Sequence, residues 1–242
     1  MIYCRLITHT IKQGDTLYLL ARKYHTTVPA ITLMNPDVNP YNLQVGTKLK
    51  ICMGETEYEP DQPQMSERQL WQDMREVFSS EGMLEKMFVD SSNFSTDNRE
   101  AIMRRLAQNP EELAQILRMY YPEDYSNSLK ILHSEQITKL EELTDAANRM
   151  EHEKMMVLLE QMQKNAGEIA DLLAQGNPEY DREYLEQMLM KLANSTYEDV
   201  NLMMEQKYPQ ALMVYEYDAR NRMELADYLT DGIIRKFYEK KM

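Results

Sequence analysis

The chain has 242 residues, 43% of them hydrophobic, and a formal net charge of −13. A chain of this size can bury a sizeable core, in one large domain or two unequal ones. The acidic excess argues against a protein that wraps nucleic acid, because its surface would repel phosphates. Residues 1–54 hold six Lys or Arg and two acidic residues (+4), whereas residues 55–242 hold 21 and 38 (−17). This asymmetry favours two bodies with different roles.

The start of the chain, MIYCRLITHTIKQGD, has neither the apolar run nor the small-residue cleavage site of a secretory signal. No stretch reaches the roughly 18 consecutive apolar residues of a membrane-spanning helix. We therefore expect a protein made in the cytoplasm without a signal peptide and without a membrane span. Export by another route, or release on lysis, stays open.

The first fifty residues predict a small β-α-α-β unit. A β-rich run at 6–11 leads into a turn glycine and helix-capping residues, which predict a helix at 17–24. A second helix is expected at 28–34, where Asn35 and Pro36 end it, and a closing strand at 48–52.

An acidic, proline-containing stretch without periodicity, residues 55–66, has the composition of a linker. It separates the small unit from a longer region with a different pattern. We place the domains at 1–54 and 67–242, with this linker between them.

From residue 67 onward, apolar residues recur every three or four positions, which predicts helices alone. The expected fold class is a small α+β module followed by a larger all-α bundle of six to eight helices. Prolines at positions 110, 122, 178 and 209 are expected to start helices, because proline fits a first turn. Between Pro122 and Gly176 the only helix breaker is Gly167, so one or two long helices should cross this stretch.

The segment from His9 to Ile51 resembles the LysM family in residue types and in spacing. The matching pieces are Gly14-Asp15-Thr16-Leu17, Ala21-Arg22-Lys23-Tyr24, Asn35-Pro36, Leu43, Val45-Gly46 and Leu49-Lys50-Ile51. The resemblance implies two helices packed on a two-stranded antiparallel sheet. It also implies non-catalytic binding of N-acetylglucosamine polymers, and peptidoglycan is expected as the ligand ahead of chitin.

In that family a groove for the glycan lies between the loop after the first strand and the loop after the second helix. By resemblance, the glycan-binding residues here are Gly14, Asp15, Thr16, Leu17, Met34, Asn35, Pro36, Tyr41 and Leu43. Glycine lets the backbone approach a sugar, and loop amides match the N-acetyl group. The same residues also suit a purely structural role, as a turn, a helix cap and a helix stop.

The two cysteines, Cys4 and Cys52, bracket this module. In the cytoplasm the default is two reduced thiols. Because the two strands of the LysM fold pair antiparallel, the resemblance makes the cysteines neighbours, and a disulfide becomes possible at an oxidising surface. The sequence departs from the family pattern at His25, often Gly or Asn, and at Cys52, commonly Pro.

Short segments of residues 67–238 resemble an uncharacterised all-helical family of Gram-positive spore formers. They are Leu70-Trp71, Arg105-Leu106 with Asn109-Pro110, 165–170, 177–180, 225–228 and 232–234. This resemblance brings no established activity. Members often have a histidine where this chain has Gln136, so we expect no metal site.

Two histidines and three polar residues of this region are candidates for a metal site or a polar network. Neither His133 nor His152 follows a glutamate by three residues, as a di-iron bundle requires, and both are predicted to be solvated. Asn165, Glu168 and Asp227 lie beside apolar helix positions. They would form a buried polar network if they face inward, and caps or surface if they face outward.

The chain has no HExxH, no GxSxG and no glycine-rich phosphate loop, so no catalytic residue, metal ligand or cofactor is predicted. We expect a non-enzymatic, glycan-targeted protein of the cell wall or spore. Its helical domain would bind another protein or a second copy. Two alternatives remain: an enzyme or metal-binding helical domain tethered by the module, and an assembly adaptor whose module no longer binds sugar.

Overall fold

A computed structural model describes residues 5–12, 15, 17–24, 26, 28–36, 38, 43–53, 65–91 and 96–239. The chain divides into two compact units, Met1–Gln62 and Pro63–Met242, which are taken one at a time below. Most of the expected linker, residues 54–64, lies outside the described residues.

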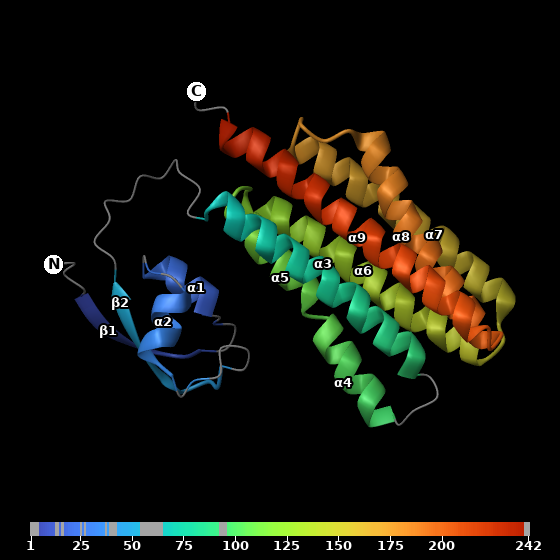
Figure 1. Ribbon diagram of the computed structural model, residues 1–242, viewed down its shortest axis with the longest axis horizontal. Coiled ribbons are helices and arrows are strands. Elements are labelled where there is room, and N and C mark those ends of the chain that lie inside the picture. Colours follow the sequence, from blue (N-terminus) through green and yellow to red (C-terminus); the bar gives the residue numbers. More distant parts are fainter. Residues whose placement is uncertain are drawn as a thin grey trace. The chain divides into compact units, whose positions relative to one another are not determined.

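The N-terminal unit follows the predicted β-α-α-β order (Figure 1). Its elements are β1 (Arg5–Thr10), α1 (Leu17–Lys23), α2 (Val28–Met34) and β2 (Lys48–Met53). The strands pair antiparallel, with Ile7 opposite Ile51 and His9 opposite Leu49. The small α+β module that the sequence predicts is therefore confirmed.

Alternation along the two strands builds the core of this unit. Leu49 and Ile51 are fully buried, while Lys48, before Leu49, and Lys50, between the two, are exposed. The inward residues pack with apolar side chains of both helices, among them Leu20 and Ile31. One face of the sheet therefore carries the helices, as a period of two requires of a half-buried strand.

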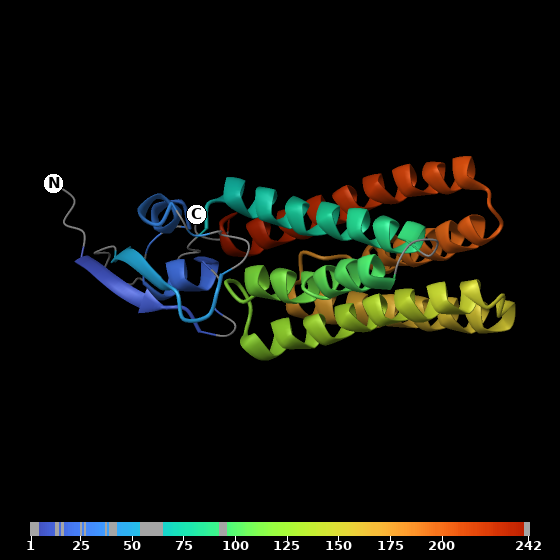
Figure 2. The same ribbon diagram turned by 90° about the horizontal axis from the view of Figure 1, so that it is seen from below.

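The second unit is entirely helical within the described residues (Figures 1 and 2). Its helices are α3 (Glu67–Asp90), α4 (Thr96–Leu106), α5 (Asn109–Leu117), α6 (Glu123–Asn148), α7 (His152–Gly176), α8 (Arg182–Met204) and α9 (Tyr208–Phe237). Consecutive helices from α6 to α9 pack in pairs, and α9 also packs against α3. None of the described helices is long and apolar enough to cross a membrane.

Helix boundaries follow the prolines in three of four places. Pro110 and Pro209 lie in the first turns of α5 and α9, and Pro122 directly precedes α6. The prediction for Pro178 is wrong, because α8 begins only at Arg182. There the side chain of Asp181 caps the helix by accepting the Tyr184 N–H at 2.8 Å.

The break between α6 and α7 falls at Met150, where the sequence holds no helix breaker. Met150 adopts a left-handed φ of 59°, and the Glu151 N–H returns to the Ala146 carbonyl at 2.9 Å. Gly167, in contrast, lies inside α7. A Cβ atom there would lie 3.1 Å from the Glu186 carboxylate of α8, so this glycine permits close helix packing.

Two of the helical segments singled out in the sequence meet in the structure. The side-chain amide of Asn177 donates to the Gly232 carbonyl at 2.9 Å, and the Tyr180 hydroxyl donates to the Leu229 carbonyl at 2.6 Å. A Cβ atom on Gly232 would come within 1.9 Å of the Tyr180 ring. These motif residues therefore join the α7–α8 connection to α9.

Candidate functional site

Two loops of the N-terminal unit leave the sheet at the same end. The Ile11 N–H, just after β1, donates to the Thr47 carbonyl at 2.9 Å, and the Gly46 N–H donates to the Ile11 carbonyl at 2.8 Å. Gly46 has a φ of 91°, a conformation that side chains disfavour. The loop after β1 and the loop before β2 are thus bonded to each other where the sequence predicts a groove.

Asp15, in the first of these loops, is held by Lys12 and His9, and His9 is held in turn by Tyr24. One carboxylate oxygen accepts the Lys12 N–H at 2.7 Å and lies 2.7 Å from Nε2 of His9. Nδ1 of His9 is in turn 2.7 Å from the Tyr24 hydroxyl. Burial opposes ionisation, but the hydrogen bonds from His9 and Lys12 lower the pKa of Asp15 below its ordinary value.

His9 is a residue that sequence reasoning missed. It is 6% exposed and links β1 to Asp15 and to Tyr24 at the end of α1. Strand alternation carries the signal that could have found it, because His9 lies on the same face as Ile7, whose side chain packs on the core.

Asn35 is fixed at the end of α2 by bonds that use both of its amide hydrogens. Nδ2 donates to the carbonyls of Ile31 at 2.7 Å and Lys50 at 2.8 Å, while Oδ1 accepts the Lys50 N–H at 2.8 Å. The side chain thus pairs with β2 as a further strand would. Leu17 also points inward and is 5% exposed. A glycan would meet these two positions through their backbone.

The remaining predicted contact residues divide by exposure. Pro36 is exposed, and Asp15, Met34 and Leu43 are half-buried. Gly14, Thr16 and Tyr41 lie outside the described residues.

The predicted proximity of Cys4 and Cys52 cannot be read from the described residues, because Cys4 is not among them. Cys52 lies in β2, half-buried and opposite Leu6 of β1. Cys52 is disulfide-bonded, as the prediction of a disulfide requires, and the other half of the bond lies outside the described residues.

In the helical unit, the prediction that His133 is solvated is wrong. Its spacing of four from both Leu129 and Ile137 places it on the inward face of α6, and it is 8% exposed. Its Nε2 lies 2.8 Å from the Glu81 carboxylate. His152 is exposed at the start of α7, as predicted.

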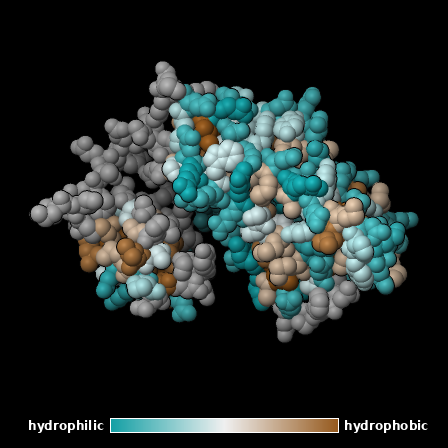
Figure 3. Space-filling view, in the orientation of Figure 1, coloured by the Kyte–Doolittle hydropathy of each residue, from teal (hydrophilic) through white to brown (hydrophobic). Residues whose placement is uncertain are grey.

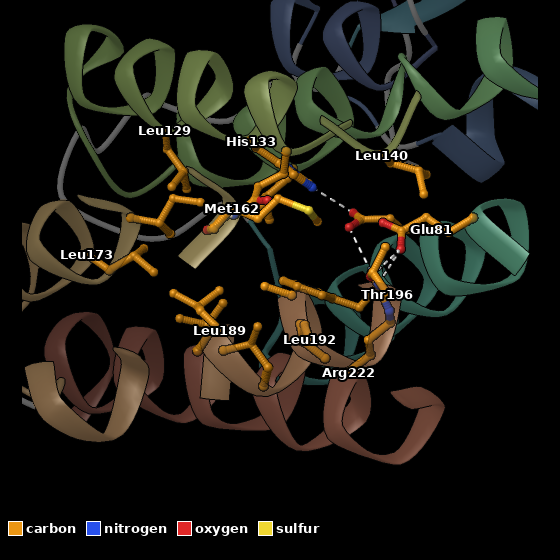
Figure 4. Close-up of a pocket in the computed structure, with 18 residues that line it drawn as sticks. Glu81, Leu129, His133, Leu140, Met162, Leu173, Leu189, Leu192, Thr196 and Arg222 are labelled. Carbon is orange, nitrogen blue, oxygen red and sulfur yellow. Dashed lines mark hydrogen bonds and ion pairs between the residues drawn. The ribbon is translucent and has the colours of Figure 1, made fainter. Parts of the chain in front are cut away.

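His133 belongs to a buried charged cluster formed with Glu81, Glu85, Asp218 and Arg222. Figure 4 labels three of its members, Glu81, His133 and Arg222. Each guanidinium nitrogen of Arg222 bonds to a different carboxylate: Nη1 to Glu81 at 2.8 Å, Nη2 to Glu85 at 2.6 Å and Nε to Asp218 at 2.6 Å. The helices α3, α6 and α9 are thereby joined by charge in a largely apolar interior.

Burial opposes ionisation of Glu81, yet the cations His133 and Arg222 lower its pKa to about 2. Glu85 behaves differently. Burial raises the pKa of Glu85 to about 7 against the effect of Arg222, and the neighbouring carboxylates of Glu81 and Asp218 add to the rise. For His133, burial is outweighed by Glu81, so its pKa is raised.

The three polar residues proposed as one network lie apart. Asn165 is buried and donates to Glu135 at 3.1 Å. Glu168 pairs with Lys164 at the surface, and Asp227 binds Arg75 through both carboxylate oxygens. Glu168 and Asp227 thus take the surface alternative and Asn165 alone is buried, so the three residues form no common network. Within the described residues, no group of three or more His, Cys, Asp or Glu is placed to hold a metal ion.

Comparison with known proteins bears on the N-terminal unit. Residues 9–51 match the family model of the LysM domain, a sugar-binding and non-catalytic module. No curated protein and no solved structure matches the chain.

Proposed function

We propose, on the premise that residues 9–51 form a LysM domain, that the protein binds glycans built from N-acetylglucosamine without catalysis, peptidoglycan foremost. The family match carries this proposal. The hydrogen bonds of Ile11 with Gly46 and Thr47 support it, because they join the loop after β1 to the segment that leads into β2. The protein would then be associated with the cell wall or, because its helical segments resemble a family of spore formers, with the spore.

The groove we propose has backbone walls and an apolar floor. Asp15 holds the first loop in place through Lys12 and His9. Met34, Pro36 and Leu43 offer apolar surface to the acetyl methyl groups and sugar faces.

The charge of the module favours one glycan over another. Residues 1–54 carry +4, counted from six basic and two acidic residues. Peptidoglycan bears carboxylates on its peptide stems, whereas chitin is neutral. A positive module therefore gains more from peptidoglycan at low ionic strength.

The helical unit serves, in this proposal, to bring several modules together. One small module buries little ligand surface, so firm attachment to a wall requires several copies acting together. The first half of α9 leaves four large apolar side chains about half exposed or more: Tyr208, Leu212, Met213 and Tyr217. Figure 3 shows one face of the helical unit, on which hydrophobic residues are scattered among hydrophilic ones. We assign the exposed part of α9 to self-association.

Co-sedimentation with purified peptidoglycan sacculi tests the proposal. The full chain should sediment with sacculi, and Met34→Glu should weaken binding by about tenfold or more, because a carboxylate would replace apolar floor and repel an anionic glycan. Leu33→Glu is the matched control. Leu33 is the neighbouring residue, 83% exposed and outside the proposed groove, so its variant should bind as the unchanged chain does.

Equal binding by the Met34→Glu and unchanged chains would remove this loop from the site. If the full chain fails to sediment, the adaptor alternative, in which the module no longer binds sugar, replaces the proposal.

A further inference from the structure

A cavity of about 80 Å³ lies inside the helical unit, among α3, α5, α6, α7, α8 and α9. Its two ends differ in chemistry (Figure 4). Leucines gather at one end, among them Leu129, Leu173 and Leu189, while Glu81, Thr196 and Arg222 lie at the other. An apolar wall with a few polar groups at one end is the usual form of a small-molecule site.

The charged cluster at the polar end has more negative groups than positive ones. Glu81 and Glu85 line the cavity together with the cations His133 and Arg222, and Asp218, which pairs with Arg222 outside the cavity lining, is a third carboxylate. Each guanidinium nitrogen of Arg222 already donates to a carboxylate, so the charge of Arg222 is paired and attracts an anionic ligand little. A cation is the ligand that would balance this end of the cavity.

Unused acceptors point the same way. Within the described residues, Glu85 accepts hydrogen bonds from Arg222 at 2.6 Å and Thr196 at 3.4 Å, both at Oε2, which leaves Oε1 open. Gln136 lines the cavity with a buried Oε1 that has no partner. Buried polar atoms without partners are costly, so a ligand that brings donors is favoured.

We propose that this cavity binds a small primary aliphatic ammonium ion, with its charged head at Glu85 and its hydrocarbon part against the leucines. The ammonium group supplies three N–H donors and one positive charge. In its absence a proton neutralises the extra carboxylate, in agreement with the raised pKa of Glu85. The ammonium replaces that proton.

The cavity volume sets the size of the ligand. An apolar cavity of about 150 Å³ accommodates benzene, with its six carbons, so in proportion about 80 Å³ suits roughly three to four non-hydrogen atoms. Propylammonium has four. The alcohol 1-propanol has the same shape and no charge, which makes it the matched probe.

The test is a titration of the full chain, methyl-labelled at Met and Leu, with propylammonium and separately with 1-propanol, followed by NMR. Propylammonium should cause saturable shifts of the Met162 and Leu189 methyl groups, which line the cavity. The alcohol should bind at least tenfold more weakly. Alcohol binding as tight as that of the amine, or amine shifts confined to surface methyl groups, would overturn the proposal.

Variants separate the charge from the space. Glu85→Gln keeps an acceptor for Arg222 and resembles the protonated carboxyl, so the fold should persist while amine affinity falls at least tenfold. Glu76→Gln makes the same change at an exposed position of α3 and should bind as the unchanged chain does. Ala193→Leu fills the cavity and should abolish binding of both probes. Undiminished amine binding by folded Glu85→Gln would contradict the assignment of the charged head.

Discussion

At the scale of single residues, the interior of the helical unit depends most on Arg222. The guanidinium is 3% exposed and neutralises carboxylates from α3 and from its own helix. A buried ion pair adds little net stability compared with apolar packing, but removing one partner leaves the others charged and unpaired.

Arg222→Ala should therefore lower the free energy of unfolding by about 3–5 kcal/mol. Urea unfolding followed by helical circular dichroism measures it. Arg75→Ala is the control, because Arg75 also makes a bidentate pair, with Asp227, but at the surface. A loss no greater than that of the Arg75 variant would show that the cluster does not depend on Arg222.

Some residue roles follow from the neighbouring sequence, whereas others depend on contacts between distant segments. The half-buried and exposed residues expected at the groove, Met34 and Pro36, follow from the end of a predicted helix. The inward role of Asn35 could not be predicted, because it depends on pairing with Lys50, fifteen residues away and across the module. The same holds for His133 and Glu81, whose contact joins helices far apart in sequence.

At the scale of elements, local signals located most helices and strands. Strand alternation and the Asn35-Pro36 stop set the four elements of the small unit, and three prolines set helix starts. One connection, the α6–α7 turn at Met150, escaped prediction. This turn and the α8–α9 turn at Gln206 both use a left-handed residue other than glycine, with φ of 59° in each. Tertiary packing imposes these turns against the preference of the residue.

Met150→Gly tests directly how much stability the left-handed conformation of this residue costs. Glycine adopts the left-handed conformation without strain, so this variant should stabilise the helical unit by about 0.5–1 kcal/mol in urea unfolding. Met83→Gly, at an exposed position in the middle of α3, should destabilise it by about 1 kcal/mol. Destabilisation by both variants would mean that the turn at Met150 carries no strain.

At the scale of the whole molecule, the buried cluster makes stability depend on pH. Glu85, which faces Arg222, Glu81, Asp218 and His133, has its pKa raised from 4.5 to about 7. Between these values the folded chain keeps a proton that the unfolded chain has lost, so stability falls as pH rises through this window. His133, with a raised pKa, acts in the same direction above pH 6.5. Glu81, with a pKa lowered to about 2, has the opposite effect on stability, but only below pH 4.5.

The free energy of unfolding should therefore be greater near pH 5 than near pH 8, by on the order of 3 kcal/mol. Urea unfolding at the two pH values measures the difference. Glu85→Gln cannot titrate and should lose most of it, whereas Glu76→Gln should retain it. Equal stability at both values in the unchanged chain would contradict the raised pKa.

The central claim, that the LysM domain binds N-acetylglucosamine polymers, is tested most directly by NMR titration of the ¹⁵N-labelled full chain with a soluble N-acetylglucosamine oligomer. Saturable shifts should fall on the backbone amides of the two loops, including Asp15, Met34 and Leu43, while amides of α3–α9 stay unchanged. Shifts confined to the helical unit, or none at all, would contradict it.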